Sequence, residues 1–283
     1  MPDSWGLAGG DEIVPGLAAV SSLGGGTVYE AWLAYDERLQ APVVAKLLRP
    51  GHVDDPASRT GIEREAMVLQ ELAHPGIARL FAHDLVSDRP HLVLEHVDGP
   101  TLSALVSSYG ALPLQQLLPL GIELCSVLHY LHGRGTCHLD VKPSNVVMGA
   151  PAKLIDFSVA MDVDAAAALD HPVGSDEYMA PEQCLPGERG PVGPSSDMWG
   201  LGATMFRAAA GYRPFDRDPR WAQLTAAPKA LPDFVPAAVG NTILSCLAPD
   251  PADRPLPVEL AARLADLLEQ VPQARLSGFS IKL

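Results

Sequence analysis

Two polar motifs separated by a predicted hairpin constrain this chain more than any other feature. The first motif is His138-Leu139-Asp140-Val141-Lys142-Pro143-Ser144-Asn145, and the second is Asp156-Phe157. Residues 146–148 and 153–155 between them are brief β-type runs, and residues 149–152 supply the turn. In an antiparallel hairpin the start of the first strand lies beside the end of the second. We therefore expect Asn145 and Asp156 to meet at the open end of the hairpin, with Asp140 a short loop away.

The residue types at this predicted site favour one kind of chemistry. A carboxylate beside a carboxamide offers hard oxygen ligands, which suit Mg²⁺ better than zinc or copper. Asp140 remains as a candidate proton acceptor beside the metal, and Lys142 adds a positive charge where an anion could be transferred. The alternative is a loop aspartate followed by a hairpin whose polar ends are only solvated.

These residues resemble the catalytic loop and the metal-binding aspartate of protein kinases. The family pattern is His-Arg-Asp, four residues, Asn, and later Asp-Phe-Gly. The chain departs from it at Leu139, where the family usually has Arg, and at Ser158, where it usually has Gly. The resemblance implies that Asn145 and Asp156 bind Mg²⁺, and that Asp140 orients the acceptor hydroxyl and takes its proton.

Composition argues against several other classes of protein. The 283 residues are 47% hydrophobic and 19% charged, so the chain is globular and can bury a large core. Its formal net charge of −14 argues against nucleic acid as a main partner. We expect no signal peptide and no membrane span, because the start is not basic and the most apolar stretch, residues 112–131, is interrupted by polar residues and prolines. The scattered cysteines predict a reducing, cytoplasmic compartment.

A glycine triplet near the start of the chain predicts a turn that approaches something closely. Apolar residues flank Gly24-Gly25-Gly26, and backbone amides in such a turn can cradle phosphates. The stretch resembles the kinase glycine-rich loop, but it does not keep the family spacing Gly-x-Gly-x-x-Gly-x-Val, so the loop is shortened. The resemblance implies that this stretch holds ATP through Leu23, Gly24, Gly25, Gly26 and Val28.

A lysine and a glutamate in the next two predicted elements form a candidate ion pair. Residues 42–48 alternate as a strand in which Lys46 has apolar neighbours, and residues 57–73 have helical periodicity with Glu65 beside the apolar face. A buried charge needs a partner, so we pair Lys46 with Glu65, as kinases do to hold the nucleotide phosphates. The alternatives are an edge lysine that reaches water and Glu63 as its partner.

The strand predicted at residues 91–95 resembles the segment that joins the two lobes of a kinase. By that resemblance Leu94 borders the back of the nucleotide pocket, the backbone carbonyl of Glu95 and the backbone groups of Val97 bond adenine, and Thr101 meets the ribose. The set of nucleotide contacts implied on this side is Val44, Leu94, Glu95, Val97, Thr101 and Val147.

Several landmarks of the predicted large lobe follow in family order. Residues 114–132 predict an amphipathic packing helix, and residues 159–173 contain no Ser, Thr or Tyr where kinases often carry an activating phosphate. That absence agrees with Leu139 in place of the arginine that would pair with such a phosphate. Residues 174–182 end in Ala-Pro-Glu, and the resemblance implies that Ser175 bonds the catalytic aspartate and lysine, while Lys142 steadies the transferred phosphoryl group.

Two further landmarks lie after the Ala-Pro-Glu motif. Ser195 and Ser196 predict a serine-capped helix start, and Asp197 matches the family's aspartate that braces the catalytic loop, although locally it could be an ordinary first-turn charge. Arg254 matches the arginine that pairs with the Ala-Pro-Glu glutamate, here Glu182.

The chain is therefore identified as a member of the eukaryotic-type serine/threonine kinases of bacteria, with a composition like that of high-GC organisms. We expect an α+β, bilobal fold: a flexible leader at 1–12, a β-rich lobe at 13–95 with one key helix, a helical lobe at 96–270 and a tail at 271–283. The expected activity is phosphoryl transfer from ATP with Mg²⁺ to Ser or Thr of a protein substrate. The alternative is a pseudokinase that serves as a nucleotide-binding scaffold, given the shortened loop, Ser158 and Leu139.

Overall fold

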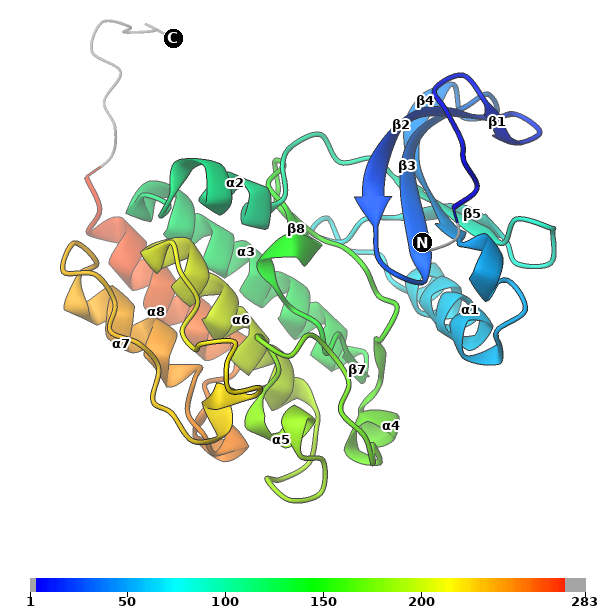
Figure 1. The fold of residues 1–283 in the computed structure, drawn as a ribbon. Coiled ribbons are helices and arrows are strands. Elements are labelled where there is room, and N and C mark those ends of the chain that lie inside the picture. Colours follow the sequence, from blue (N-terminus) through cyan, green and yellow to red (C-terminus); the bar gives the residue numbers. More distant parts are fainter. Residues whose placement is uncertain (1–3, 273–283) are drawn as a thin grey trace, which may run out of the picture.

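The small lobe is an antiparallel sheet beside one long helix. The computed structural model describes residues 4–272 (Figure 1). Six strands lie in the order β1-β2-β3-β4-β6-β5, and every pair in this sheet is antiparallel. The strands are β1 (Glu12–Val14), β2 (Leu17–Gly25), β3 (Tyr29–Asp36), β4 (Ala41–Leu48), β5 (Leu80–Asp84) and β6 (His91–Glu95).

The two faces of this sheet bury different sets of apolar residues. Alternation along β3 places Trp32 and Ala34 in a cluster on the back face, with residues of β1, β2 and β4. The front face packs on helix α1 (Pro56–Glu71), where Ile62 and Ala66 meet residues of β4 and β6. Asp55 starts this helix, because its side chain accepts a hydrogen bond from Ser58 N at 2.9 Å.

Helix α3 (Leu114–Gly133) is the centre of the large lobe. It packs against α6 (Pro194–Ala210) and α8 (Pro257–Glu269), as Figure 1 shows. Gly121 permits this close packing, since a Cβ there would lie 2.6 Å from Met205 and 2.7 Å from Leu264. The other helices of the lobe are α2 (Leu102–Tyr109), α4 (Val163–Ala167), α5 (Pro181–Cys184) and α7 (Ala237–Ser245).

Short elements between α3 and α4 carry the two polar motifs. The predicted hairpin forms from β8 (Val146–Val147) and β9 (Lys153–Leu154), and a second short pair joins β7 (Thr136–Cys137) to β10 (Met161–Asp162). Isolated bridges from Ile77 to Leu154 and from Thr101 to Val147 attach the hairpin to its surroundings. Single turns of 3₁₀ helix occur at Pro50–His52, Pro143–Asn145, Ala222–Leu224 and Pro251–Asp253.

The structure confirms the bilobal α+β architecture and corrects a detail of it. The predicted serine cap before Asp197 is wrong: α6 begins at Pro194 after Gly193, and Ser196 Oγ instead accepts from Gly193 N and donates to Glu182. Between residues 4 and 272, no helix is both long and apolar enough to cross a bilayer.

The structure describes most of the predicted leader but little of the predicted tail. Residues 4–11, which we expected to be loose, make defined contacts: Trp5 Nε1 donates to Leu48 O at 2.7 Å. Most of the predicted tail, residues 273–283, lies outside the described residues.

Candidate active site

A three-residue ion-pair cluster joins the two lobes. Lys46 Nζ of β4 lies 2.7 Å from Glu65 Oε2 of α1 and 2.7 Å from Asp156 Oδ1. Asp156 follows β9 in the large lobe. Glu65 is fully buried and also accepts a hydrogen bond from Phe157 N at 3.3 Å, whereas Glu63 is exposed. The structure thus pairs Lys46 with Glu65 rather than with Glu63.

Burial and charge act in opposite directions on this cluster. Burial lowers the pKa of Lys46, but the two carboxylates outweigh it and raise that pKa above its ordinary value. Burial raises the pKa of Asp156, yet the charge and hydrogen bond of Lys46 bring it well below its usual range. Burial also raises the pKa of Glu65 against the opposing pull of Lys46. Lys46 is therefore charged and Asp156 ionised at neutral pH.

The predicted catalytic loop brings four polar side chains together. Lys142 Nζ lies 2.6 Å from Asp140 Oδ2 and 2.6 Å from Ser175 Oγ, and Asn145 Nδ2 donates to Asp140 O at 3.0 Å and Oδ2 at 3.1 Å. The other carboxylate oxygen of Asp140, Oδ1, is buried without a hydrogen-bond partner within residues 4–272. An unsatisfied buried oxygen is costly, so this atom can accept a further hydrogen bond.

The Asp197 carboxylate, on α6, holds the backbone of the same loop. Its Oδ2 accepts from His138 N at 2.9 Å, and its Oδ1 accepts from Leu139 N at 2.7 Å. Leu139 has φ of +61°, which a leucine adopts only when its surroundings hold it there. The bracing role predicted for Asp197 is confirmed, and the alternative of an ordinary helix-start charge is wrong.

Asn145 and Asp156 fit a cation that is shared with a substrate. The amide nitrogen of Asn145 is used by Asp140, which leaves its carbonyl oxygen to face a metal. Within residues 4–272, no group of three or more His, Cys, Asp or Glu side chains is arranged to enclose a metal ion. Mg²⁺ is commonly held by one or two protein oxygens together with phosphates and waters, so this sparse donor set suits it.

An apolar cluster holds the segment that follows Asp156. Leu139 packs with Cys137, Met161, Ala166 and Val192, and the side chains of Val159, Val163, Leu169 and Val173 pack against this cluster. Gln183 adds two hydrogen bonds, to Leu139 O at 2.8 Å and Val173 O at 2.9 Å. Hydrophobic contacts around Leu139 and two hydrogen bonds from Gln183 therefore hold this segment against the predicted catalytic loop.

Comparison with known proteins decides the family. Residues 17–280 match the family described as protein kinase domain. This chain belongs to the protein kinase family. The landmark residues listed in the sequence analysis thus occupy one kinase domain, and the resemblance on which the predictions rested is confirmed.

The kinase domain is similar to several actinobacterial proteins. It is 32% identical over 206 residues to serine/threonine-protein kinase PknB of Mycobacterium leprae, covering 69% of this chain and 32% of that protein. It is 31% identical over 252 residues to the probable serine/threonine-protein kinase PkwA of Thermomonospora curvata (87% and 33%). It is 32% identical over 247 residues to serine/threonine-protein kinase PknA of Mycobacterium tuberculosis (81% and 56%). The chain therefore spans about a third to just over half of these relatives.

The glycine turn of the kinase domain is compact. β2 runs through Gly25 and β3 begins at Tyr29, so the turn itself is Gly26–Val28. Gly24 and Gly25 have φ of +101° and +154°, and a Cβ at Gly25 would lie 2.3 Å from Tyr29 O. Glycine is thus required at Gly25, although the family spacing is not kept.

The residues predicted to contact adenine and ribose differ in burial and in the contacts they already make. Leu94 and Val28 pack against the α1 cluster, and Val147 is buried in the hairpin, whereas Leu23 is half exposed. Thr101 caps α2, since its Oγ1 accepts from Ala104 N at 3.1 Å, and its hydroxyl hydrogen stays available to a ribose. The Glu95 carboxylate is bonded to Lys153 at 2.8 Å through both oxygens, which leaves only its backbone for adenine.

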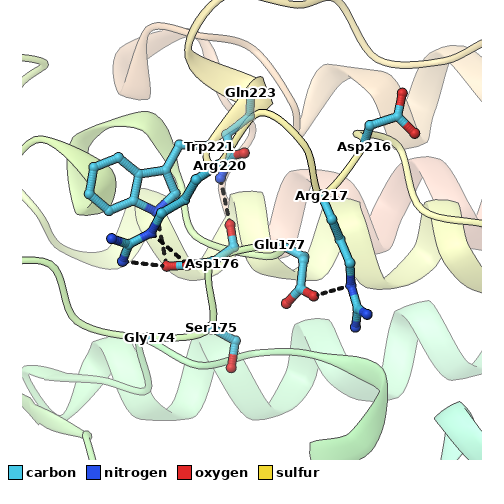
Figure 2. Close-up of a pocket in the computed structure, with 9 residues that line it drawn as sticks. All are labelled: Gly174, Ser175, Asp176, Glu177, Asp216, Arg217, Arg220, Trp221 and Gln223. Atoms are coloured by element: carbon cyan, nitrogen blue, oxygen red, sulfur yellow. Dashed lines mark hydrogen bonds and ion pairs between the residues drawn. The ribbon is translucent and has the colours of Figure 1, made fainter.

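A cavity of about 610 Å³ opens beside Ser175 (Figure 2). Asp176 on its wall accepts from Arg220 at 2.7 and 3.1 Å, and Glu177 is paired with Arg217 at 2.6 Å. Since Ser175 contacts Lys142, this charged cavity lies beside the predicted catalytic loop.

Two residues near Lys46 were missed in the sequence. The Tyr29 ring lies 4.6 Å from Lys46 Nζ and leaves no room for a side chain at Gly61, where a Cβ would lie 2.8 Å from its hydroxyl. Burial raises the pKa of Tyr29 to about 12, so its hydroxyl stays neutral. An aromatic residue and a glycine at facing positions carry no local periodicity, so only the fold could reveal this contact.

Proposed function

We propose that this domain transfers the γ-phosphoryl group of ATP, with Mg²⁺, to Ser or Thr hydroxyls of a protein substrate. One observation carries the proposal: Asp140 presents a buried, unpartnered carboxylate oxygen while its other oxygen is held by Lys142. A hydroxyl that donates to this oxygen would satisfy it and pass its proton to it as the new bond forms. The names of the similar proteins, all serine/threonine-protein kinases, support the choice of acceptor.

The other residues would position and neutralise charge. Lys46, held by Glu65, would bind the nucleotide phosphates, and Asn145 and Asp156 would hold Mg²⁺, which supplies charge neutralisation at the phosphates when bound. Lys142 lies between the carboxylate of Asp140 and the hydroxyl of Ser175, so it would steady the transferred group. Phosphoryl transfer requires mainly such positioning, and little covalent chemistry from the protein.

A catalytically weak scaffold is the second candidate. It is favoured by the compact glycine turn and by Ser158 beside Asp156. Both features bear on how nucleotide and metal are held. A scaffold of this kind would bind nucleotide without transferring phosphate.

Phosphate transfer and nucleotide binding, measured together, separate these functions. We expect the wild type to label itself or a generic basic protein from γ-labelled ATP. Asp140→Asn should lower the rate about 10²-fold or more, which is several kcal/mol of transition-state stabilisation, yet keep the thermal shift caused by Mg-ATP. Lys46→Met should lose both. A wild type that shifts with Mg-ATP but labels no faster than Asp140→Asn would support the scaffold instead.

A further inference from the structure

The N-terminal segment covers the back face of the small-lobe sheet. Trp5 and Leu7 pack against the back-face cluster, and Figure 1 shows the segment (dark blue) running alongside the strands. Ala45 and Leu47 of β4 belong to this cluster, so Lys46 between them points to the opposite, front face. The segment therefore lies on the far side of the sheet from the nucleotide.

Glu30 of β3 is the anchor for this segment. Only 4% of its surface is exposed, and its Oε1 accepts from Trp5 N at 3.0 Å while its Oε2 accepts from Ser4 Oγ at 3.0 Å. A buried carboxylate is costly without donors, so these two hydrogen bonds satisfy Glu30 and fix the segment together. Arg49 Nη1 is farther away, at 3.9 Å from Glu30 Oε2.

Arg49 connects the anchor to the glycine turn. Its Nε donates to Gly26 O at 2.9 Å, and its backbone N donates to Val28 O at 2.9 Å. The neighbouring carbonyl, Leu48 O, is held by the Trp5 indole at 2.7 Å. One continuous set of contacts thus runs from the N-terminal segment to the turn at Gly26–Val28, which follows Gly24 and Gly25 at the end of β2.

We propose that Ser4, Trp5, Glu30 and Arg49 form an N-terminal clasp that positions the glycine turn for nucleotide phosphates. While Ser4 and Trp5 satisfy Glu30, the Arg49 guanidinium stays on the Gly26 carbonyl. Without them, Glu30 attracts Arg49 into a close ion pair and removes it from the turn, and the turn loses its fixed shape. The nucleotide part of this inference rests on the proposed function.

Nucleotide affinity tests the clasp against a merely structural role. Trp5→Ala and Arg49→Met should weaken Mg-ATP binding, and raise its KM, by about 10-fold, while kcat changes by less than about twofold. Trp5→Phe keeps an aromatic ring on the back-face cluster but loses the indole donor to Leu48 O, so it should lie between wild type and Trp5→Ala. The matched control is Asp36→Asn, a carboxylate with 6% exposure at the other end of β3 that accepts from Arg38 N and Leu39 N. It should lower stability and leave ATP affinity unchanged.

Hydrogen exchange supplies a readout that does not need catalysis. Amides of residues 22–28 should exchange at least several times faster in Trp5→Ala and Arg49→Met than in wild type, and at the wild-type rate in Asp36→Asn. If the wild type binds no nucleotide, the proposed function fails, and the exchange arm still decides the clasp. If residues 22–28 exchanged at the wild-type rate in both Trp5→Ala and Arg49→Met, the clasp would be overturned. Should Trp5→Ala not fold, Ser4→Ala and Trp5→Phe carry the same comparison.

Discussion

At the scale of single residues, Leu139 shows how an apolar side chain packs beneath the segment that follows Asp156. It is 3% exposed, and its neighbours in the cluster are apolar. An arginine at this position would need a phosphate, and residues 159–173 offer no hydroxyl to carry one. Burial among apolar side chains therefore holds Leu139 in place.

Replacing Leu139 with arginine should destabilise the domain. The guanidinium would enter an apolar cluster without an anion, so we expect Leu139→Arg to lower the free energy of unfolding by about 3 kcal/mol. Leu39→Arg is the matched control, because Leu39 is 38% exposed at the β3–β4 turn and should change stability by less than about 0.5 kcal/mol. Urea unfolding measures both. Equal midpoints for the two variants would show that the cluster does not hold the segment.

Site residues were predictable from the sequence where a charged side chain lies within an otherwise apolar strand or beside an apolar helix face. Lys46 within an apolar strand and Glu65 beside an apolar helix face each require a partner, and they find one another at 2.7 Å. The capping role of Thr101 was not predicted: its hydroxyl oxygen accepts from Ala104 N, while its ribose contact stays a prediction. Trp5 could not be foreseen, since its partners lie 25 and 43 residues away.

At the scale of elements, a partly buried ion pair connects β6 to β9. Lys153 is 8% exposed and lies 2.8 Å from both carboxylate oxygens of Glu95, the last residue of β6. Burial raises the pKa of Glu95, but the Lys153 hydrogen bond and charge, with the Arg79 amide, bring it below its ordinary value. The pair joins the connection between the lobes to the hairpin that carries Asn145 and Asp156.

The lowered pKa of Glu95 predicts a pH dependence with a definite sign. A carboxyl whose folded pKa is depressed adds stability above its unfolded pKa, about 4.3, and loses it as the pH falls through the folded value. Lys153→Met should therefore destabilise the domain at pH 7, and the difference from wild type should shrink below about pH 4.3. Urea unfolding across pH 3.5–7 measures this. Lys229→Met, at the exposed pair with Asp216, should cause a small change throughout. A Lys153 effect that stays constant with pH would contradict the assignment.

Elements with a pattern of their own were predicted closely, and elements without one were not. The helix expected at residues 114–132 from its period is α3 (Leu114–Gly133), the strand expected at 91–95 is β6 (His91–Glu95), and the hairpin expected around residues 149–152 is β8 with β9. β10 has two residues and pairs with β7 some 25 positions earlier. Such a pair has no period of its own, so residues 159–173 gave no signal for β10 or α4.

At the scale of the whole molecule, one buried ion pair links distant segments of the large lobe. The Arg254 guanidinium donates to Glu182 Oε1 at 2.6 Å and Oε2 at 2.9 Å, with both side chains fully buried and 72 residues apart. Its remaining donors go to carbonyl oxygens, and the group lies 5.0 Å from the Trp199 ring. The pair thus joins α5, at the end of the activation segment, to α6 and to the chain before α8.

Breaking this pair should cost far more than breaking a surface pair. Arg254→Met leaves Glu182 charged in a buried site, so we expect a loss of about 3–5 kcal/mol. Arg220→Met is the control: its pair with Asp176 has 64% and 42% exposed side chains, and its loss should cost less than about 1 kcal/mol. Adding Glu182→Gln to Arg254→Met removes the orphaned charge and should recover part of the stability. If the double variant is no more stable than Arg254→Met, the pair stabilises the lobe by packing and not by charge.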